Sequence, residues 1–351
     1  MSVAKDLRSD RDDLTPTRPS AGTAVILNAN AKRVTPRVRR LVEASAGDAD
    51  VFFTEDLEQA QFVSHRVADR GYKLVVTGGG DGTVTNTIDQ VVRRIEDTRG
   101  AEQVPYPQFA VLKLGTGNAV ADFLQARHFK QDLAELSQAQ VKPVDLIQLD
   151  DGRRVPFAGF GWDAHILNNY DQLKEAAQKN RVTRALFKSV LGYLIAGLGK
   201  SVPEFLIQRP QWQCRVINAG GMALQLDTDG NVVKRFAPGE VVYEGGVRMA
   251  CFGTTPYFGF KFKIMPFADR TPGMFHLRLI NMPPLAAVAQ LRSAWKGKMR
   301  HRNLTDLQMT ACRIEFDDKA PFQIAGDAEG YRDSIELKVN EQPLECLHFA
   351  A

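Results

Sequence analysis

The first part of the chain alternates short apolar runs with longer segments of helical periodicity. Apolar runs rich in β-branched residues are typical of buried strands, and apolar positions three and four residues apart are typical of helices. The strand-like runs cover 25–27, 51–54, 73–77 and 110–114, and the clearest helix-like segments cover 35–46 and 56–70. This alternation predicts a doubly wound parallel sheet, with helices on both faces, over residues 23–145.

The pattern changes after Asp145. One long helical segment covers 164–200, and the rest is dominated by short strand-like runs separated by turn signals such as 228–231. The strand-like runs are 212–216, 222–226, 247–252, 276–280, 313–316 and 335–339. The sequence therefore predicts a second, mainly antiparallel β-rich domain over residues 146–340. Residues 1–22 are polar, and we expect a disordered tail there.

Two glycine-rich segments follow predicted strands and precede predicted helices. Residues 78–83 read Gly-Gly-Gly-Asp-Gly-Thr, and residues 114–118 read Leu-Gly-Thr-Gly-Asn. Glycine lets backbone N–H groups approach a ligand, and a helix start adds unpaired N–H donors and a positive dipole end. A tight strand-to-helix turn would explain one such segment equally well. Two of them at one edge of a parallel sheet, with Asp81 inside the first, predict a phosphate site.

The same residues carry a family resemblance. Residues 79–83 match the G-G-D-G-T motif of the diacylglycerol kinase catalytic domain family, and residues 114–118 match its L-G-T-G-N motif. Asn28 lies at the start of the family's N-P-x-S-G segment, of which this chain keeps only that asparagine. The chain from about residue 23 to about residue 347 resembles this family, which includes bacterial lipid kinases and sphingosine and ceramide kinases.

The resemblance implies a fold and an activity. The implied fold has an α/β domain shared with NAD kinases, an antiparallel β-sandwich, and a C-terminal segment, 341–351, that returns to the first domain. The implied activity is transfer of the γ-phosphoryl group of ATP to the hydroxyl of a diacylglycerol-, sphingoid- or ceramide-like lipid. Asp81 then either holds Mg²⁺ or receives the hydroxyl proton, and both roles stay open. The implied nucleotide-binding residues are Asn28, Gly79, Gly80, Gly82, Thr83, Gly115, Thr116, Gly117 and Asn118.

A second carboxylate is expected from the far domain, where the family has an I-D-G-E motif. This chain reads Ile-Ala-Gly-Asp at 324–327, so Ala325 replaces the first acid and Asp327 stands where the family has glutamate. Asp is one methylene shorter than Glu, and a carboxylate displaced by about 1 Å can lower a rate by orders of magnitude. We expect Asp327 to be the second catalytic acid, with Glu329 as the alternative.

Composition narrows the function only slightly. The 351 residues are 44% hydrophobic and 25% charged, as in ordinary globular proteins, and the formal net charge of +4 is too small to indicate nucleic-acid binding. The four cysteines have no C-x-x-C spacing. They therefore predict buried thiols in a reducing compartment rather than a zinc site or a disulfide framework.

The sequence also bears on membranes. The polar segment 1–22 has no apolar core of a signal peptide, and the most apolar segment, 185–198, is shorter than the ~20 residues that span a bilayer. Basic and apolar residues interleave in 181–200 and 291–300, which fits either an amphipathic surface on anionic lipid or helices with one core face. We expect a cytoplasmic protein, with docking at the inner membrane surface and a homodimer left open.

Two other functions remain open. A kinase of a soluble substrate, of the NAD kinase type, shares the G-G-D-G-T motif and the two-domain plan. Such kinases do not usually carry the L-G-T-G-N motif that residues 114–118 match. A nucleotide-binding regulatory protein without catalysis is conceivable because Ala325 and Asp327 depart from the acid motif.

Overall fold

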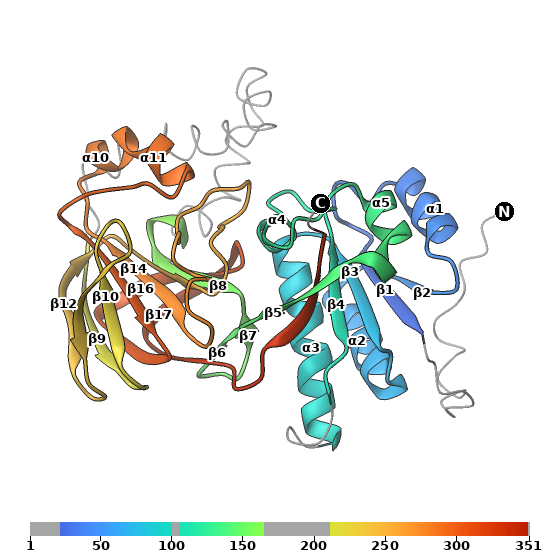
Figure 1. Cartoon of the computed structure of the whole chain (residues 1–351), viewed down its shortest axis with the longest axis horizontal. Coiled ribbons are helices and arrows are strands. Elements are labelled where there is room, and N and C mark those ends of the chain that lie inside the picture. Colours follow the sequence, from blue (N-terminus) through green and yellow to red (C-terminus); the bar gives the residue numbers. More distant parts are fainter. Residues whose placement is uncertain (1–21, 100–104, 165–210, 350–351) are drawn as a thin grey trace.

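Two β-sheets organise the chain, one in each of two domains that lie side by side (Figure 1). The computed structural model describes residues 22–99, 105–164 and 211–349. Within these residues the first sheet has six strands in the order β2-β1-β3-β4-β18-β5, and the second has twelve. The predicted fold class, a parallel-sheet α/β domain followed by a mainly antiparallel β-rich domain, is confirmed.

Strands and helices alternate along the first domain, and β1 to β4 pair in parallel. Helix α1 packs beside α5, and α2 packs beside α3. The strands of this sheet are β1 (Thr23–Asn28), β2 (Asp50–Thr54), β3 (Leu74–Gly78), β4 (Gln108–Leu112), β5 (Gln140–Val144) and β18 (Leu344–His348). The helices are α1 (Pro36–Ser45), α2 (Leu57–Arg70), α3 (Asp81–Arg99), α4 (Ala119–Phe123), α5 (Phe129–Ala134) and the 3₁₀ helix η2 (Leu136–Gln138).

Local sequence sets the ends of the first two helices. The Thr35 hydroxyl accepts a backbone N–H in the first turn of α1 (3.3 Å), and the Asp56 carboxylate does the same for α2 (2.8 Å). Gly71 ends α2 in the left-handed region, at a φ of +69°. The predicted segments 35–46 and 56–70 therefore contain the two helices together with their N-terminal capping residues, and Gly71 lies one residue beyond the second segment.

The second sheet is antiparallel and continuous among the described residues. Its main path is β11-β10-β15-β14-β13-β8-β16-β17-β6-β7, and β9 pairs with both β16 and β12. β16 pairs with β9 through its first half and with β8 near its end, so it joins the β9–β12 pair to the main path of the sheet. The elements are β6 (Ile147–Leu149), β7 (Arg154–Val155), β8 (Phe157–Gly161), β9 (Trp212–Asn218), β10 (Ala223–Leu226), β11 (Val232–Phe236), β12 (Val241–Val247), β13 (Met249–Gly253), β14 (Phe275–Ile280), α10 (Pro284–Ala289), α11 (Leu291–Trp295), β15 (Leu304–Met309), β16 (Ala311–Ile324) and β17 (Asp327–Val339).

Two sequence predictions for this domain need comment. The segment 247–252, predicted as one strand, is the end of β12 and most of β13, because the chain changes strand at Arg248. The predicted helix 164–200 and the basic stretch 181–200 lie outside the described residues.

The chain crosses between the domains twice, after β5 and again before β18. β18 lies between β4 and β5, parallel to the former and antiparallel to the latter. Each domain has its own apolar core, and Tyr257 packs against both cores. The four cysteines are buried and free, as the sequence predicts. No helix among the described residues is long and apolar enough to cross a bilayer.

Candidate active site

The candidate site lies where β1, β3 and β4 end at the carboxyl edge of the first sheet. β3 ends at Gly78, and residues 79–80 join it to α3, which begins at Asp81. Asn28, the last residue of β1, donates from Nδ2 to the Thr83 hydroxyl (3.1 Å). The parallel pairing of β1 with β3 thus brings together two residues, Asn28 and Thr83, that the sequence predicts at one site.

The second glycine-rich turn joins β4 to α4 and touches the first turn. Within it, the Gly115 N–H donates to Asn118 Oδ1, and Asn118 Nδ2 donates to the Gly115 carbonyl, both at 2.8 Å. Asn118 has a φ of +57°, which asparagine tolerates better than most residues. A Cβ on Gly115 would lie 2.1 Å from the Gly79 carbonyl oxygen, so only glycine allows the two turns to come this close.

Asp81 lies between the two turns and is 9% exposed. Its Oδ1 accepts the Val120 N–H in the first turn of α4 (3.2 Å). Burial raises the pKa of Asp81 from 3.8 to about 6; N–H donors from residues 119 and 120 oppose this, and the charges of Asp122 and Asp327 add to it. The site therefore contains a carboxylate that titrates just below neutral pH.

Asp327 reaches the start of α3 from the second domain. It follows a two-residue turn between β16 and β17, in which Ala325 has a φ of +49° and Gly326 a φ of +87°. Positive φ at both positions is characteristic of a type I′ hairpin turn, so Ala325 is a turn residue and the turn survives without an acid there. A Cβ on Gly82 would lie 1.7 Å from Asp327 Oδ2, which places this carboxylate against the first turn of α3.

The turn before Asp327 is anchored inside the second domain. Gln323 Oε1 accepts the Gly326 N–H (2.9 Å), and Gln323 Nε2 donates to the Asp163 carboxylate (3.0 Å). Burial raises the pKa of Asp163 to about 7. Asp327 is exposed, but the neighbouring protein partly desolvates its carboxylate, which raises its pKa, and the charge of Glu329 adds to that effect.

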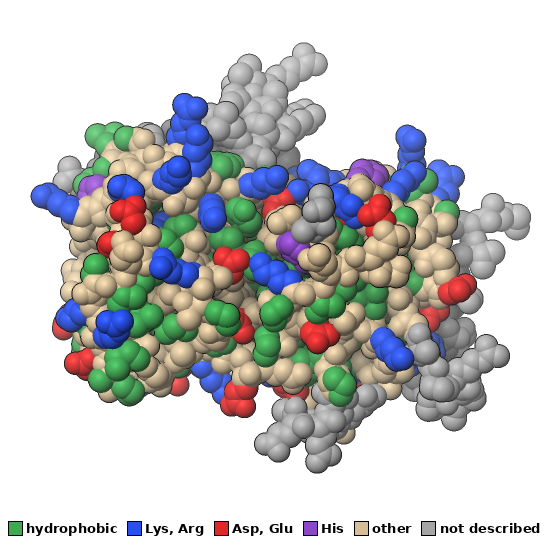
Figure 2. All heavy atoms as spheres, viewed as in Figure 1, with side chains coloured by type: hydrophobic (Ala, Val, Ile, Leu, Met, Phe, Trp, Pro, Cys, Tyr) green, Lys and Arg blue, Asp and Glu red, His purple; other side chains and the backbone are tan. Residues whose placement is uncertain are grey.

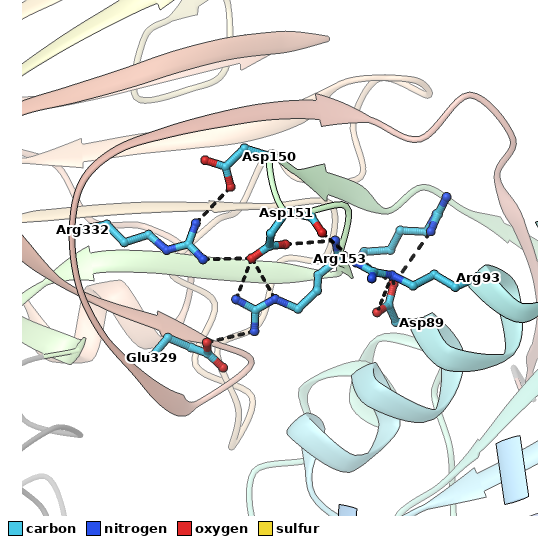
Figure 3. Close-up of polar contacts among 8 residues, drawn as sticks. Asp89, Arg93, Asp150, Asp151, Arg153, Glu329 and Arg332 are labelled. Carbon is cyan, nitrogen blue, oxygen red and sulfur yellow. Dashed lines mark hydrogen bonds and ion pairs between the residues drawn. The ribbon is translucent and has the colours of Figure 1, made fainter. Parts of the chain in front are cut away.

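Glu329 occupies a different environment from Asp327. Its Oε2 accepts a hydrogen bond from Arg153 Nη1 (2.9 Å), and Figure 3 shows Arg153 between Glu329 and Asp151. Of the two acids that the sequence leaves as alternatives, Asp327 is therefore the one against Gly82, and Glu329 is held in an ion pair.

A basic pocket of about 470 Å³ opens beside the second turn and is lined by Thr116, Gly117 and Asn118. Its cations are Arg33, Lys113 and Lys261. Lys113 is paired with Asp122, whereas Arg33 and Lys261 have no ion pair within the part of the chain that the structure describes. Two uncompensated cations beside a glycine-rich turn suit an anionic group such as phosphate.

The second domain closes this pocket. The Phe260 N–H donates to the Gly117 carbonyl (2.7 Å), and the side chains of Phe260 and Trp295 line the pocket from the second domain. Sequence reasoning missed these residues. Lys113 directly precedes the motif at 114–118 and could have been found, but Lys261 and Trp295 lie in no recognisable motif.

The acids at the site do not form a protein-only metal cage. Among residues 22–99, 105–164 and 211–349, no group of three or more His, Cys, Asp or Glu side chains could hold a metal ion. Mg²⁺ in phosphate-transferring sites commonly takes one or two carboxylates together with substrate phosphates and water. Asp81 fits such a donor set, because burial and, to a smaller extent, neighbouring carboxylates disfavour its negative charge, which a bound cation would compensate.

Comparison with known proteins confirms the family resemblance. Residues 21–149 match the family model of the diacylglycerol kinase catalytic domain. A diacylglycerol kinase of Staphylococcus carnosus is 21% identical over 306 residues, which cover 85% of this chain and 84% of the relative. A diacylglycerol kinase of Staphylococcus epidermidis is 29% identical over 102 residues, which are 29% of this chain and only 28% of that relative.

Solved structures share the fold. A crystal structure of a diacylglycerol kinase from Bacillus anthracis superposes with a TM-score of 0.60 at 12% identity, over 93% of this chain and 97% of the other. A second structure from the same organism gives a TM-score of 0.66 at 16% identity, over 93% and 95% of the two chains.

The contact between the two turns predicts a steric effect. We expect Gly115→Ala to destabilise the protein by about 1–3 kcal/mol, because a methyl group would force the turns apart. Gly80→Ala is the matched control, since nothing lies within 4 Å of a Cβ there, and its effect should stay below ~0.5 kcal/mol. Urea denaturation measures both variants. Equal destabilisation in the two would contradict the contact.

The raised pKa of Asp81 predicts that replacing this residue stabilises the protein at high pH but not at low pH. Its pKa is 3.8 when water surrounds the side chain, as in the unfolded chain, and about 6 in the folded protein, so the folded state binds more protons between these values. The free energy of unfolding therefore falls as pH rises through this window, by roughly 3 kcal/mol in total. We expect Asp81→Asn to be about as stable as the wild type at pH 4 and more stable at pH 8.

Denaturation midpoints of both proteins at pH 4, 6 and 8 measure this difference. Because Asp163 titrates in both proteins, its contribution cancels in the difference between wild type and variant, which reports the titration of Asp81 together with its interaction with Asp327. A difference that does not change with pH would refute the explanation.

Proposed function

We propose that this chain, whose residues 21–149 belong to the diacylglycerol kinase catalytic domain family, is an ATP-dependent kinase that phosphorylates a lipid hydroxyl. The observation that carries the proposal is the meeting of two acids from different domains. Asp327 of β17 lies against Gly82, next to Asp81 in the first turn of α3. Phosphoryl transfer needs positioned phosphates, compensated charge and a group that takes the proton of the attacking hydroxyl.

In the proposed complex the nucleotide phosphates lie at the two glycine-rich turns. Backbone N–H groups of both turns, with the side chains of Thr83 and Thr116, would position them. Arg33 and Lys261 would compensate their charge from the pocket. Mg²⁺, when bound, would be held by Asp81 with phosphate oxygens and water, and would neutralise charge on the phosphates.

Asp327 is the proposed general base. It is exposed enough to meet an acceptor, and its raised pKa suits it to accept a proton. The acceptor hydroxyl oxygen forms a bond to the γ-phosphorus, and the bond from that phosphorus to the β–γ bridging oxygen breaks. The hydroxyl proton passes to Asp327, and the nucleoside diphosphate leaves with the electron pair.

The proposed acceptor is a diacylglycerol-, sphingoid- or ceramide-like lipid, and the named function of the Staphylococcus carnosus relative supports a lipid over a soluble molecule. The motif at 114–118 supports the same choice. A soluble acceptor of the NAD kinase type, and nucleotide binding without turnover, are the other outcomes of the test.

Incubation with γ-labelled ATP, Mg²⁺, a mixed lipid extract and NAD tests the proposal. We expect a labelled lipid, identified by mass spectrometry. Labelled NADP instead would support the soluble-acceptor alternative. Nucleotide binding with no labelled product would support the regulatory alternative, and either result overturns the lipid kinase.

The same assay with substituted proteins tests which of the acids take part in the transfer. We expect Asp81→Asn and Asp327→Asn to lower kcat by about 10²–10⁴-fold, because each removes a carboxylate used in the transfer. Glu329→Gln keeps the shape of the side chain and should lower kcat by about tenfold or less. Full activity in Asp327→Asn, with a large loss in Glu329→Gln, would instead make Glu329 the base.

We also propose that α11 and the residues after it dock on an anionic membrane surface. Arg292, Lys296 and Lys298 are exposed there, whereas Ala294 is buried. Figure 2 shows Lys and Arg side chains along the edge of the molecule where Figure 1 shows α10 and α11. Trp295 of α11 lines the pocket, so a protein docked in this way would have its pocket close to the lipid.

Vesicle binding tests this surface. We expect Lys296→Gln/Lys298→Gln to weaken binding to anionic vesicles at low salt about thirtyfold, since each of the two lysines near such a surface contributes about 1 kcal/mol. The control, Lys234→Gln/Arg235→Gln, removes the same charge from the exposed strand β11 and should bind like the wild type. Sedimentation with anionic and neutral vesicles measures both. The proposal fails if the wild-type protein does not bind anionic vesicles at low salt, or if both variants lose the same amount of binding.

A further inference from the structure

A network of polar contacts joins α3 to β17 through the β6–β7 hairpin (Figure 3). These two elements carry the two candidate acids, because α3 begins at Asp81 and β17 begins at Asp327. We call this set the junction network. Its members are Asp89, Arg93, Glu96, Asp150, Asp151, Arg153, Arg154, Glu329 and Arg332.

The first half of the junction network ties the β6–β7 hairpin to α3. Asp89 Oδ1 accepts the Arg154 N–H (2.8 Å), and Arg154 Nη2 binds Glu96 Oε2 (2.5 Å). Arg93, which is paired with Asp89, also donates to the Asp151 carbonyl (3.1 Å). Three side chains on successive turns of one helix therefore hold the hairpin.

The second half ties the same hairpin to β17. Asp151 Oδ2 accepts from Arg153 (2.9 Å) and from Arg332 (2.8 Å). Arg332 also binds Asp150 (3.0 Å), and Arg153 Nη1 binds Glu329 Oε2 (2.9 Å). Glu329 lies two residues after Asp327 on β17, so the network holds this strand close to the position of the Asp327 carboxylate.

We propose that the junction network is a clamp that sets the position of Asp327 against Gly82, and that Arg153 is its central positioning residue. The catalytic consequence rests on the proposed function, in which Asp327 takes the proton. Arg153 binds Asp151 of the hairpin and Glu329 of β17, so it fixes the start of β17 on the hairpin, with which β17 also pairs in the second sheet. Arg93 and Arg154 in turn connect the hairpin to α3 across the domain junction.

The junction network differs from isolated surface ion pairs because its members share partners and because the half that contacts α3 is buried. The side chains of Arg154 and Asp89 are only 6% and 5% exposed. Burial raises the pKa of Asp151, but hydrogen bonds from Arg153 and Arg332 outweigh it and lower this pKa to about 2. A side chain already ordered by one partner loses little further freedom on binding a second, so a network holds geometry better than separate pairs.

Arg94 supplies a matched control on the same helix. It makes two hydrogen bonds to Asp69, of 2.8 and 2.9 Å, and Asp69 belongs to α2 of the first domain. Arg94→Met therefore removes a guanidinium from a bidentate ion pair on α3 without touching the domain junction.

A double-mutant cycle measures the kinetic effect, with labelled ATP and the acceptor that the assay above identifies. We expect Arg153→Met and Glu329→Gln each to lower kcat about five- to tenfold, with little change in KM for ATP, and Arg94→Met to leave kcat unchanged. The double variant should be no worse than the singles.

A distance measurement gives a readout that needs no activity. Spin labels on cysteines introduced at the exposed positions Glu43 of α1 and Val233 of β11 report the distance between the domains. The native cysteines are buried and should not compete for the label. We expect the distance distribution to broaden in Arg154→Met and in Arg93→Met, because each loses a contact between α3 and the hairpin, and to match the wild type in Arg94→Met.

The outcomes separate the clamp from the proposed function. If the wild type is active, Arg153→Met matches Arg94→Met in kcat and Arg154→Met matches it in distance distribution, the clamp is overturned and the function stands. If no lipid is labelled but the distribution broadens in Arg154→Met, the function fails and the clamp stands. Should Arg154→Met fail to fold, an unchanged distribution in Arg93→Met overturns the clamp.

Discussion

The contact of the Asp327 carboxylate with Gly82 depends on how the two domains meet, and the candidate chemistry depends on that contact. A rotation of one domain against the other would separate Asp327 from Asp81 while each apolar core stayed intact. Displacements of about an ångström are enough to impair phosphoryl transfer. Contacts on both sides of the site oppose such a rotation. They are the return of β18 to the first sheet, the Phe260–Gly117 hydrogen bond and the polar contacts along α3.

The site also concentrates negative charge that folding by itself disfavours. Burial and neighbouring carboxylates raise the pKa of Asp81, and partial desolvation with a nearby acid raises that of Asp327. An ionised buried carboxylate lowers stability unless a partner compensates it. In the proposed complex, the cation that accompanies the nucleotide would compensate this charge together with Arg33 and Lys261, which line the neighbouring pocket. Such unfavourable charge is typical of functional sites rather than of structural ones.

Most local features could be predicted because their causes are adjacent in sequence. The caps Thr35 and Asp56 each bind a backbone N–H three residues later, and the two glycine-rich turns directly follow the strands that position them. Prediction failed at Arg248, where one apolar run divides into two strands. The pairing order of the second sheet could not be predicted from the sequence either, because burial and register select antiparallel partners across long sequence separations.

The sequence by itself determined that two glycine-rich turns stand at one sheet edge with Asp81 in the first of them, since strand, turn and helix follow one another along the chain. Only the tertiary structure decided which distant acid joins them. Asp327 and Glu329 are two residues apart on one strand, yet one lies against Gly82 and the other binds Arg153, 176 residues away. Local periodicity cannot distinguish them, because the difference arises from the packing of one domain on the other.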